Sequence, residues 1–202
     1  MKLIPDSFLI SLLIVPAIGL TSCSHKNNRT VSHEINIHID RFEEDLFSID
    51  LYHLSDSIPY LQKKYPDFFP LFTYQVISIG GPDEPEFPNR LLAFVSDFTN
   101  YRVSKRVKEI FPDMSLYEHE LSAAFSGFKA VFPEMPIPRI ITCITGFNQS
   151  IITADSVLAI SLDKYLGSDE EFYNLIYPPV PEYLRRIMRP EKIPSDVLQA
   201  WI

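Results

Sequence analysis

The placement of proline is the feature that most limits what this chain of 202 residues can fold into. The sequence has 17 prolines against six glycines. Because proline lacks a backbone N–H and disfavours helical geometry in the residue before it, each one tends to end or bend a regular element. Pro59, Pro112 and Pro133, and the group of prolines within 178–181, divide the chain into short segments. The sequence therefore predicts short helices and strands joined by proline-containing connections.

Charge and hydrophobic content exclude several classes of protein. Hydrophobic residues make up 46% of the chain and aromatic residues 13%, which is enough for a packed core and too much for a disordered chain. The 18 basic and 26 acidic residues give a net charge of −8 without a basic run, which argues against a nucleic-acid partner. Two cysteines cannot staple a disulfide-rich module. The composition favours an acidic globular domain.

The first 23 residues predict a secretory leader that ends at a lipid-attachment site. Lys2 precedes an apolar run, Phe8–Leu20, which is shorter than the ~20 residues that span a bilayer. Leu20-Thr21-Ser22-Cys23 resembles a bacterial lipobox, in which the cysteine sulfur receives a diacylglyceryl group and cleavage makes that cysteine the first residue. Asp6 fits such a leader poorly, and the alternative is a plain secretory signal in which Cys23 has no role.

Lipidation of Cys23 would hold the protein at a membrane that the polypeptide does not cross. Each buried methylene contributes about 0.8 kcal/mol, so a triacylated (palmitate-bearing) cysteine anchors firmly. The chain then divides into a signal peptide (1–22), a lipidated tether (23–33) and a folded domain (34–202). Ser24 is not acidic, which favours the outer membrane of a Gram-negative envelope over retention in the inner membrane.

Hydrophobic spacing predicts an α+β domain with several helices packed on a small β-sheet. Alternating isoleucines predict a strand over 34–39, and two apolar segments, 139–147 and 156–162, are expected to pair as neighbouring strands. Helices are predicted over 40–54, 89–111, 115–132, 182–189 and 190–202, with an aromatic turn at 65–70 and helix caps at Ser115–Glu118, Ser168–Glu171 and Ser195-Asp196. The last helix has no stop signal, so we expect the chain to be truncated within it.

His119 begins the nearest match to a metal-binding motif. A zinc-binding His-Glu-x-x-His helix places two imidazoles four residues apart on one face. Ala123 stands where the second histidine would be, so we interpret His119 as a solvated or capping residue. His33 and His38 lie five residues apart on a predicted strand and would point to opposite faces. The sequence predicts no metal ligands and no cofactor.

Other candidate residues do not form a complete catalytic set. Cys143 lies in an alternating apolar stretch and is interpreted as a small buried hydrophobe. Asp163 directly follows a predicted strand, where site residues often lie, although a structural role is the alternative. Neither Gly80-Gly81 nor Gly146 leads into the helix that a phosphate loop needs. The remaining carboxylates considered for acid–base work, with a solvated surface as the alternative, are Asp97, Glu118 and Asp155.

Several short sequence motifs, here called phrases, follow one another along the chain. They are Tyr65–Phe69 (YPDFF), Phe128-Lys129 with Phe132-Pro133, Thr145–Ser150 (TGFNQS), Leu162–Gly167 (LDKYLG), and Met188–Glu191 (MRPE) leading to Ala200-Trp201. Together with the lipobox, this set resembles the gliding-motility-associated lipoprotein GldB family of Bacteroidetes over most of residues 40–202. The resemblance implies an envelope lipoprotein associated with motility and its secretion apparatus. It also implies a remote likeness to zinc metallopeptidases, whose metal motif is not in these residues, and a family domain that runs on past Trp201.

These observations favour a membrane-anchored, non-enzymatic lipoprotein that acts through contacts with other envelope proteins. The main alternative is a degenerate or incomplete zinc hydrolase of the metallopeptidase type. A third possibility is a glycan-binding lipoprotein that uses exposed Tyr and Phe. Metal analysis separates the first two, and glycan binding tests the third.

Overall fold

A computed structural model describes residues 35–202. The predicted signal peptide, Cys23 with its tether, and His33 lie outside these residues. The regular elements in chain order are β1 (Ile39–Arg41), α1 (Phe42–Phe47), α2 (Leu54–Lys64), α3 (Phe68–Leu71), α4 (Phe87–Ser96), α5 (Phe98–Ile110), α6 (Ser115–Val131), β2 (Arg139–Cys143), β3 (Ile151–Thr153), β4 (Val157–Ser161), α7 (Phe172–Leu175), α8 (Glu182–Arg185) and α9 (Ile193–Trp201). None of the described helices has both the length and the apolar character needed to cross a bilayer.

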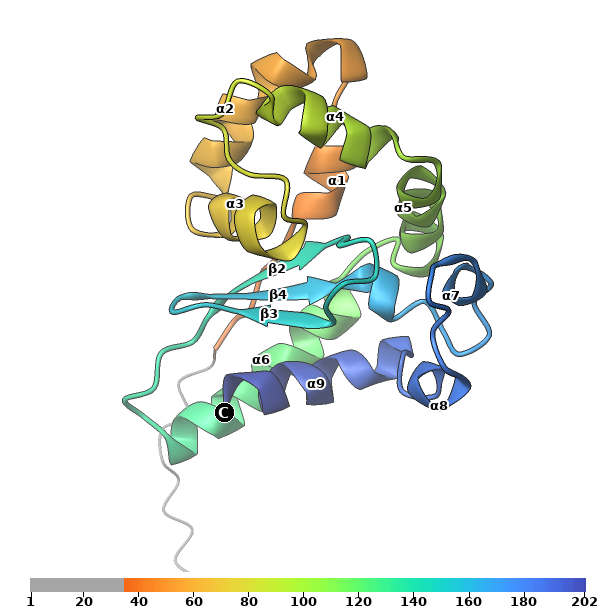
Figure 1. The fold of residues 1–202 in the computed structure, drawn as a ribbon. Helices are drawn as coiled ribbons and strands as arrows, with labels where there is room; N and C mark the ends of the chain where they lie inside the picture. Colours follow the sequence, from red (N-terminus) through yellow and green to blue (C-terminus); the bar gives the residue numbers. More distant parts are fainter. Residues whose placement is uncertain (1–34) are drawn as a thin grey trace, which may run out of the picture. The chain divides into compact units, whose positions relative to one another are not determined.

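One mixed sheet forms the centre of the described domain (Figure 1). Its strand order is β1-β2-β4-β3, in which β1, β2 and β4 are parallel and β3 is antiparallel to β4. The predicted pairing of the 139–147 and 156–162 segments is confirmed, with Ile140 opposite Leu158. The pair is parallel because the connection is long enough to form β3 on the far side of β4 before the chain returns. The α+β prediction is confirmed.

Helices cover both faces of the sheet, so the inner strand β4 is buried throughout. Every residue of β4 is buried, as expected for a strand between two helical layers. Leu158 and Ile160 belong to a core that includes residues of α5, α6 and α9, whereas Val157 and Ala159 belong to a core with α1, α2, α3 and α4. Figure 1 shows α6 and α9 on the side of the sheet opposite α1–α4, with α5 beside α4 at one end of the sheet.

The core on the α1–α4 side is built around the ring of Phe42. Its centroid lies 5.0 Å from Tyr65, 5.2 Å from Phe68 and 4.9 Å from Phe72, all in edge-on geometry. The segment predicted as a turn over 65–70 therefore starts a helix, α3, and continues into a π-helical turn at Phe72–Val76. Pro70 is tolerated because it lies in the first turn of α3, where its missing N–H would have no helical partner.

Residues 35–38 run along α6 instead of joining the sheet, so the strand predicted over 34–39 is wrong for 35–38 and confirmed at Ile39, and Glu34 lies outside the described residues. The backbone N–H groups of residues 35, 37 and 39 donate to α6 side chains: to Ser126 Oγ at 3.1 Å, to Ser122 Oγ at 2.9 Å and to Glu118 Oε1 at 2.9 Å. Acceptors four residues apart on a helix rise about 6 Å, close to the ~6.6 Å spanned by two extended residues. The segment runs antiparallel to α6.

The long predicted helices are interrupted in the structure. The helix predicted over 89–111 divides at Asp97, whose Oδ1 accepts the N–H of Asn100 at 2.9 Å and so caps α5. The helix predicted over 40–54 ends at Phe47, and α8 covers only the first half of 182–189. Conversely, Pro59 lies inside α2. Because proline has no N–H, the carbonyl of Ser55 lacks its helical hydrogen bond, but both residues are on the exposed side of the helix, where water can take its place.

The predicted caps are wrong, and the acidic side chain of each has a tertiary partner instead. Ser115 and Ser195 lie inside helices, and α7 begins after Glu171 without a side-chain cap. Glu118 accepts from Ile39, and the carboxylate of Asp196 accepts the hydroxyl of Tyr165 at 3.0 Å. The helical phase of α6 is confirmed, with Leu121, Phe125 and Phe128 buried and the helix ending before Pro133.

Candidate functional site

A buried polar cluster lies where the parallel strands β2 and β4 end. Cys143 is the last residue of β2, Ser161 is the last residue of β4, and Asp163 follows two residues later. Because carboxyl ends of neighbouring parallel strands meet at one edge of a sheet, the fold brings these side chains together with Thr145. All four residues are buried, and Asp163 is 0% exposed. We call these residues the Asp163 cluster.

Asp163 closes the turn that follows β2. Its Oδ2 accepts the backbone N–H of Phe147 at 2.6 Å and that of Thr145 at 3.2 Å, and the Thr145 hydroxyl lies 3.4 Å away. Its Oδ1 is buried and has no hydrogen-bond partner among the described residues. Burial raises the pKa of Asp163 to about 6, outweighing the opposing effect of the backbone donors.

The turn held by Asp163 has an unusual backbone conformation. Gly146 has φ of +68° and Phe147 has φ of +67°. Residues other than glycine rarely adopt this left-handed backbone conformation. Phe147 is kept there by its bond to Asp163, by edge-on packing against Tyr173 at 5.8 Å between centroids, and by Lys164 Nζ, which donates to its carbonyl at 3.3 Å. The cluster thus fixes a strained turn.

The remaining members of the cluster are bonded to one another. Ser161 Oγ donates to Thr145 Oγ1 at 3.1 Å, and Cys143 Sγ lies 3.6 Å from Ser161 Oγ. Burial raises the pKa of Cys143 well above its ordinary value, so the reactive thiolate is disfavoured. The interpretation of Cys143 as a small buried hydrophobe is confirmed. The sequence signal for this cluster was the position of Asp163 after a strand; its partners could not be read from spacing.

The histidines and Gly80-Gly81, considered as ligand sites, lie away from the cluster, whereas Gly146 lies in its turn. His119 is exposed on α6, as predicted, and His38 pairs with Glu118 at 2.9 Å while remaining largely exposed. Residues 35–202 contain no group of three or more metal-ligating side chains. The N–H of Gly81, which a phosphate loop would offer to an anion, donates to Glu84 at 2.9 Å.

The three other carboxylates have separate positions. Asp97 caps α5, and Glu118 binds the backbone of the 35–39 segment. Asp155 is exposed in the turn between β3 and β4. These positions give Asp97 and Glu118 structural roles, and Asp155 lies on the solvated surface that the sequence offered as the alternative.

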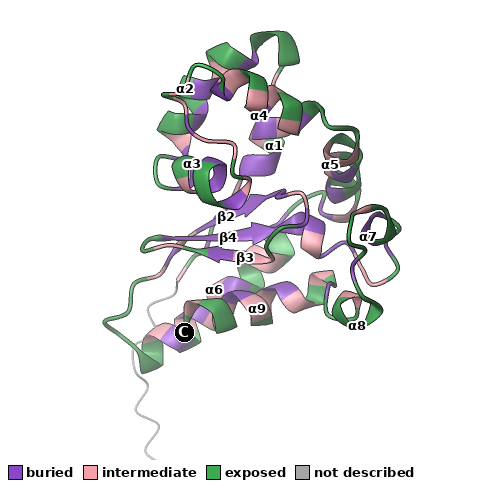
Figure 2. Ribbon diagram, in the orientation of Figure 1, coloured by how far each residue is buried: buried purple, intermediate pink, exposed green. Residues whose placement is uncertain are grey.

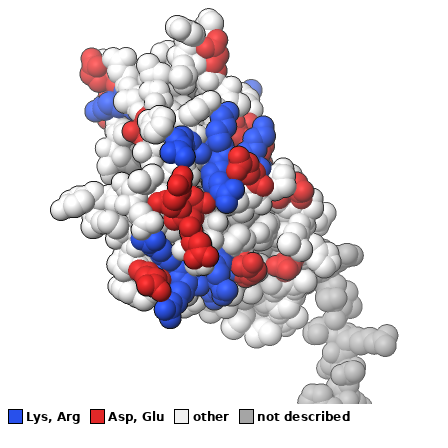
Figure 3. Space-filling view, turned by 90° about the vertical axis from the view of Figure 1, so that its right-hand side faces the viewer, with Lys and Arg blue, Asp and Glu red and all other residues white. Residues whose placement is uncertain are grey.

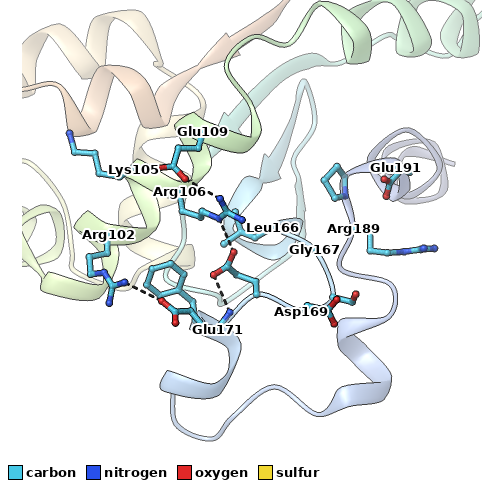
Figure 4. Close-up of a pocket in the computed structure, with 14 residues that line it drawn as sticks. Arg102, Lys105, Arg106, Glu109, Leu166, Gly167, Asp169, Glu171, Arg189 and Glu191 are labelled. Atoms are coloured by element: carbon cyan, nitrogen blue, oxygen red, sulfur yellow. Dashed lines mark hydrogen bonds and ion pairs between the residues drawn. The ribbon is translucent and has the colours of Figure 1, made fainter.

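A charged groove of about 900 Å³ lies beside α5 (Figure 4). Arg106 donates to Glu170 at 2.9 Å and to Glu109 at 3.0 Å, and Arg102 pairs with Glu171 at 3.1 Å. Figure 3 shows basic and acidic side chains interleaved on this face. Because five acidic residues line the groove beside four basic ones, the groove has no excess of positive charge that would favour a phosphate. Sequence reasoning missed the groove because most of its ion pairs join residues more than 60 positions apart.

Next to this groove the segment that contains α7 and α8 exposes several large apolar side chains, and Figure 2 shows both helices as largely exposed. We define the α7–α8 surface as the exposed hydrophobic residues Leu175, Tyr177, Tyr183, Leu184 and Ile187. Tyr177 is 98% exposed. The segment is held from beneath by buried Tyr173 and Val180, and Arg185 donates to the Val180 carbonyl at 2.7 Å. An apolar surface on a fixed segment with a charged margin is typical of a protein-binding site.

These features define a class of protein: a helix-covered α+β domain with a closed polar cluster and an open apolar surface. The chain belongs to the family of the gliding motility protein GldB, whose family model matches residues 24–202. The resemblance seen in the sequence is confirmed, and its phrases Thr145–Ser150 and Leu162–Gly167 contain Thr145 and Asp163 of the cluster. The GldB family is not a known enzyme family. Searches of curated proteins and of solved structures each returned no match.

Proposed function

We propose that this protein is anchored by lipidated Cys23 in the cell envelope, at the outer membrane, and acts in gliding motility or its secretion machinery by binding other envelope proteins. The anchor is supported by the lipobox and by the family match, which starts at Ser24, directly after the proposed first residue of the mature chain. The non-acidic Ser24 favours the outer membrane.

The α7–α8 surface is the observation that carries the proposed binding role. Burying large apolar side chains is favourable by about 25 cal/mol per Å², and five such side chains lie exposed within 13 residues, 175–187. The groove alongside them, with Arg102 and Glu171 at its edge, supplies a charged rim. The partner we propose is an envelope protein with a complementary apolar surface.

Complementation tests this function in the organism. The chromosomal copy is replaced by a Leu175→Ser/Tyr177→Ser/Ile187→Ser variant, and colony spreading is measured. We expect spreading to be lost although the variant accumulates normally. A matched control, Tyr52→Ser/Leu116→Ser, removes exposed apolar side chains elsewhere and should spread like the wild type. Normal spreading by the triple variant would contradict the proposal.

Two further results would overturn individual parts of the proposal. The Cys23→Ser variant should no longer sediment with membranes, and its continued sedimentation would remove the lipid anchor. Stoichiometric zinc in the purified protein would favour the alternative of a metallopeptidase-like hydrolase over a binding protein. Metal analysis of the full mature chain measures this directly.

A further inference from the structure

We propose that the surface where the tether enters the domain rests on the lipid bilayer; this inference depends on the lipid anchor proposed above. The surface, called here the tether-end surface, consists of Val131, Phe132 and Met135, with Trp201 beside them. Val131 is 69% exposed, and Phe132 and Met135 are also exposed. Its occupant is a bilayer of neutral lipids.

The place where the tether joins the domain is the first argument for a membrane contact. The described chain begins at Ile35, whose N–H is bonded to Ser126 near the C-terminal end of α6. Because the 35–39 segment runs antiparallel to α6, the chain enters the domain at this end. Ser126 is five residues, about 7.5 Å of helical rise, from Val131. The tether therefore joins the domain close to the tether-end surface.

The short reach of the tether is the second argument for a membrane contact. Eleven residues, 24–34, separate the lipidated cysteine from Ile35. On the random-coil scale a chain of that length reaches about 20 Å, less than the diameter of about 40 Å expected for a compact domain of this size. An anchor of this reach keeps the entry end of the domain closest to the membrane.

The tether-end surface has the chemistry of a membrane interface. The Phe132 ring packs on Phe128, with 5.1 Å between centroids. Lys129 Nζ donates to the carbonyls of Pro133 and Met135, which fixes the loop. Trp201 donates its indole N–H to the Pro136 carbonyl at 3.0 Å, so its ring keeps a satisfied polar edge. Aromatic side chains with this dual character are enriched at bilayer interfaces.

The charges around this surface select the kind of lipid. The exposed carboxylates of Glu134 and Asp155 lie beside it, and Lys129 is already engaged with the backbone. Carboxylates are repelled by anionic headgroups, so the surface fits zwitterionic lipids. In Figure 1 the C-terminal end of α6 lies far from α7 and α8, so a domain resting on this end keeps the α7–α8 surface free for a protein partner.

The chain's single tryptophan provides the test. The full lipidated protein is incorporated into phosphatidylcholine vesicles with or without brominated acyl chains, which quench indole fluorescence only at close range. We expect Trp201 fluorescence to fall at least twofold in brominated vesicles. Unchanged fluorescence in a protein that co-sediments with the vesicles would overturn the tether-end surface and leave the anchor intact. Failure to co-sediment would overturn the anchor and this inference with it.

Matched variants locate the contact. Val131→Glu/Met135→Glu should reduce the quenching while the lipidated protein still co-sediments. Leu116→Glu, at the other end of α6 and 62% exposed in the wild type, should leave the quenching unchanged. A tryptophan moved by Trp201→Phe/Tyr52→Trp should not be quenched, because Tyr52 lies on the other side of the sheet. Equal quenching at both probe positions would contradict a specific orientation.

Discussion

The Asp163 cluster and the α7–α8 surface are opposite in almost every physical respect. The cluster contains polar groups that are buried and bonded to one another, whereas the surface contains apolar groups that face water. The cluster includes residues of the family phrases, and the surface lies outside them. The difference teaches that the family phrase around Asp163 maintains a turn in the fold, and that the exposed segment nearby is where another protein can bind.

Labelling of Cys143 tests most strongly whether the cluster is closed. Cys143 is fully buried, so a thiol reagent reaches it only when the domain opens. We expect native labelling to be at least about 10³-fold slower than labelling in urea, in line with ordinary domain stability. A control cysteine, Ser55→Cys on the exposed side of α2, should be labelled quickly. Comparable rates at both positions would mean that the cluster is open to solvent.

Asp163 should make stability depend on pH in a direction opposite to most carboxylates. Its folded pKa of about 6 exceeds the ordinary value of 3.8, so the folded state holds a proton that the unfolded state releases. Stability from this group is present below pH 4 and is lost as the pH rises to 6. The difference between the folded and unfolded pKa values of Asp163 corresponds to about 3 kcal/mol of stability.

The variant Asp163→Asn isolates this effect, because its amide oxygen can accept the same N–H groups without titrating. We expect its free energy of unfolding, relative to that of the wild type, to rise by about 2.4 kcal/mol between pH 4 and pH 7. Urea unfolding at several pH values measures this difference. A difference that stays constant across the range would show that Asp163 is not a buried titrating group.

Gly146 gives a smaller test of the turn that Asp163 holds. Gly146→Ala leaves ordinary space for the new methyl group but places it at φ of +68°, which should cost about 1 kcal/mol. Gly127→Ala, inside α6 with open space around it, should stabilise by up to about 1 kcal/mol. Thermal unfolding should therefore show shifts of opposite sign. A stabilising Gly146→Ala would mean that the turn is not strained.

Local pattern was sufficient to predict the parts of the fold whose cause is local. Leu121, Phe125 and Phe128 recur at helical spacing, and Pro133 blocks continuation, so α6 was predictable. The two apolar strand segments were predictable for the same reason. The strand predicted over 34–39 failed although its alternation is real, because the partners of its N–H groups are Ser122 and Ser126, more than 80 residues away.

The candidate site was predictable only in part. Asp163 follows a strand, and that position marked it as a candidate. Its bonds to Thr145 and Phe147 depend on the parallel pairing of β2 and β4, which the spacing of the segments did not specify. The α7–α8 surface was also hidden, because an apolar residue in the sequence is expected to be buried and only the packing shows that Tyr177 is not.

Photo-crosslinking at position 177 tests the proposed protein contact most directly. Tyr177 is replaced by a photoreactive benzoylphenylalanine in the full chain, and Tyr52, which is 96% exposed, is replaced in the same way as a control. Cells are irradiated, and the envelope fraction is examined for covalent adducts. A discrete protein adduct at position 177 that is missing at position 52 is the predicted result. No adduct at position 177, or the same adducts at both positions, would contradict a specific protein contact at the α7–α8 surface.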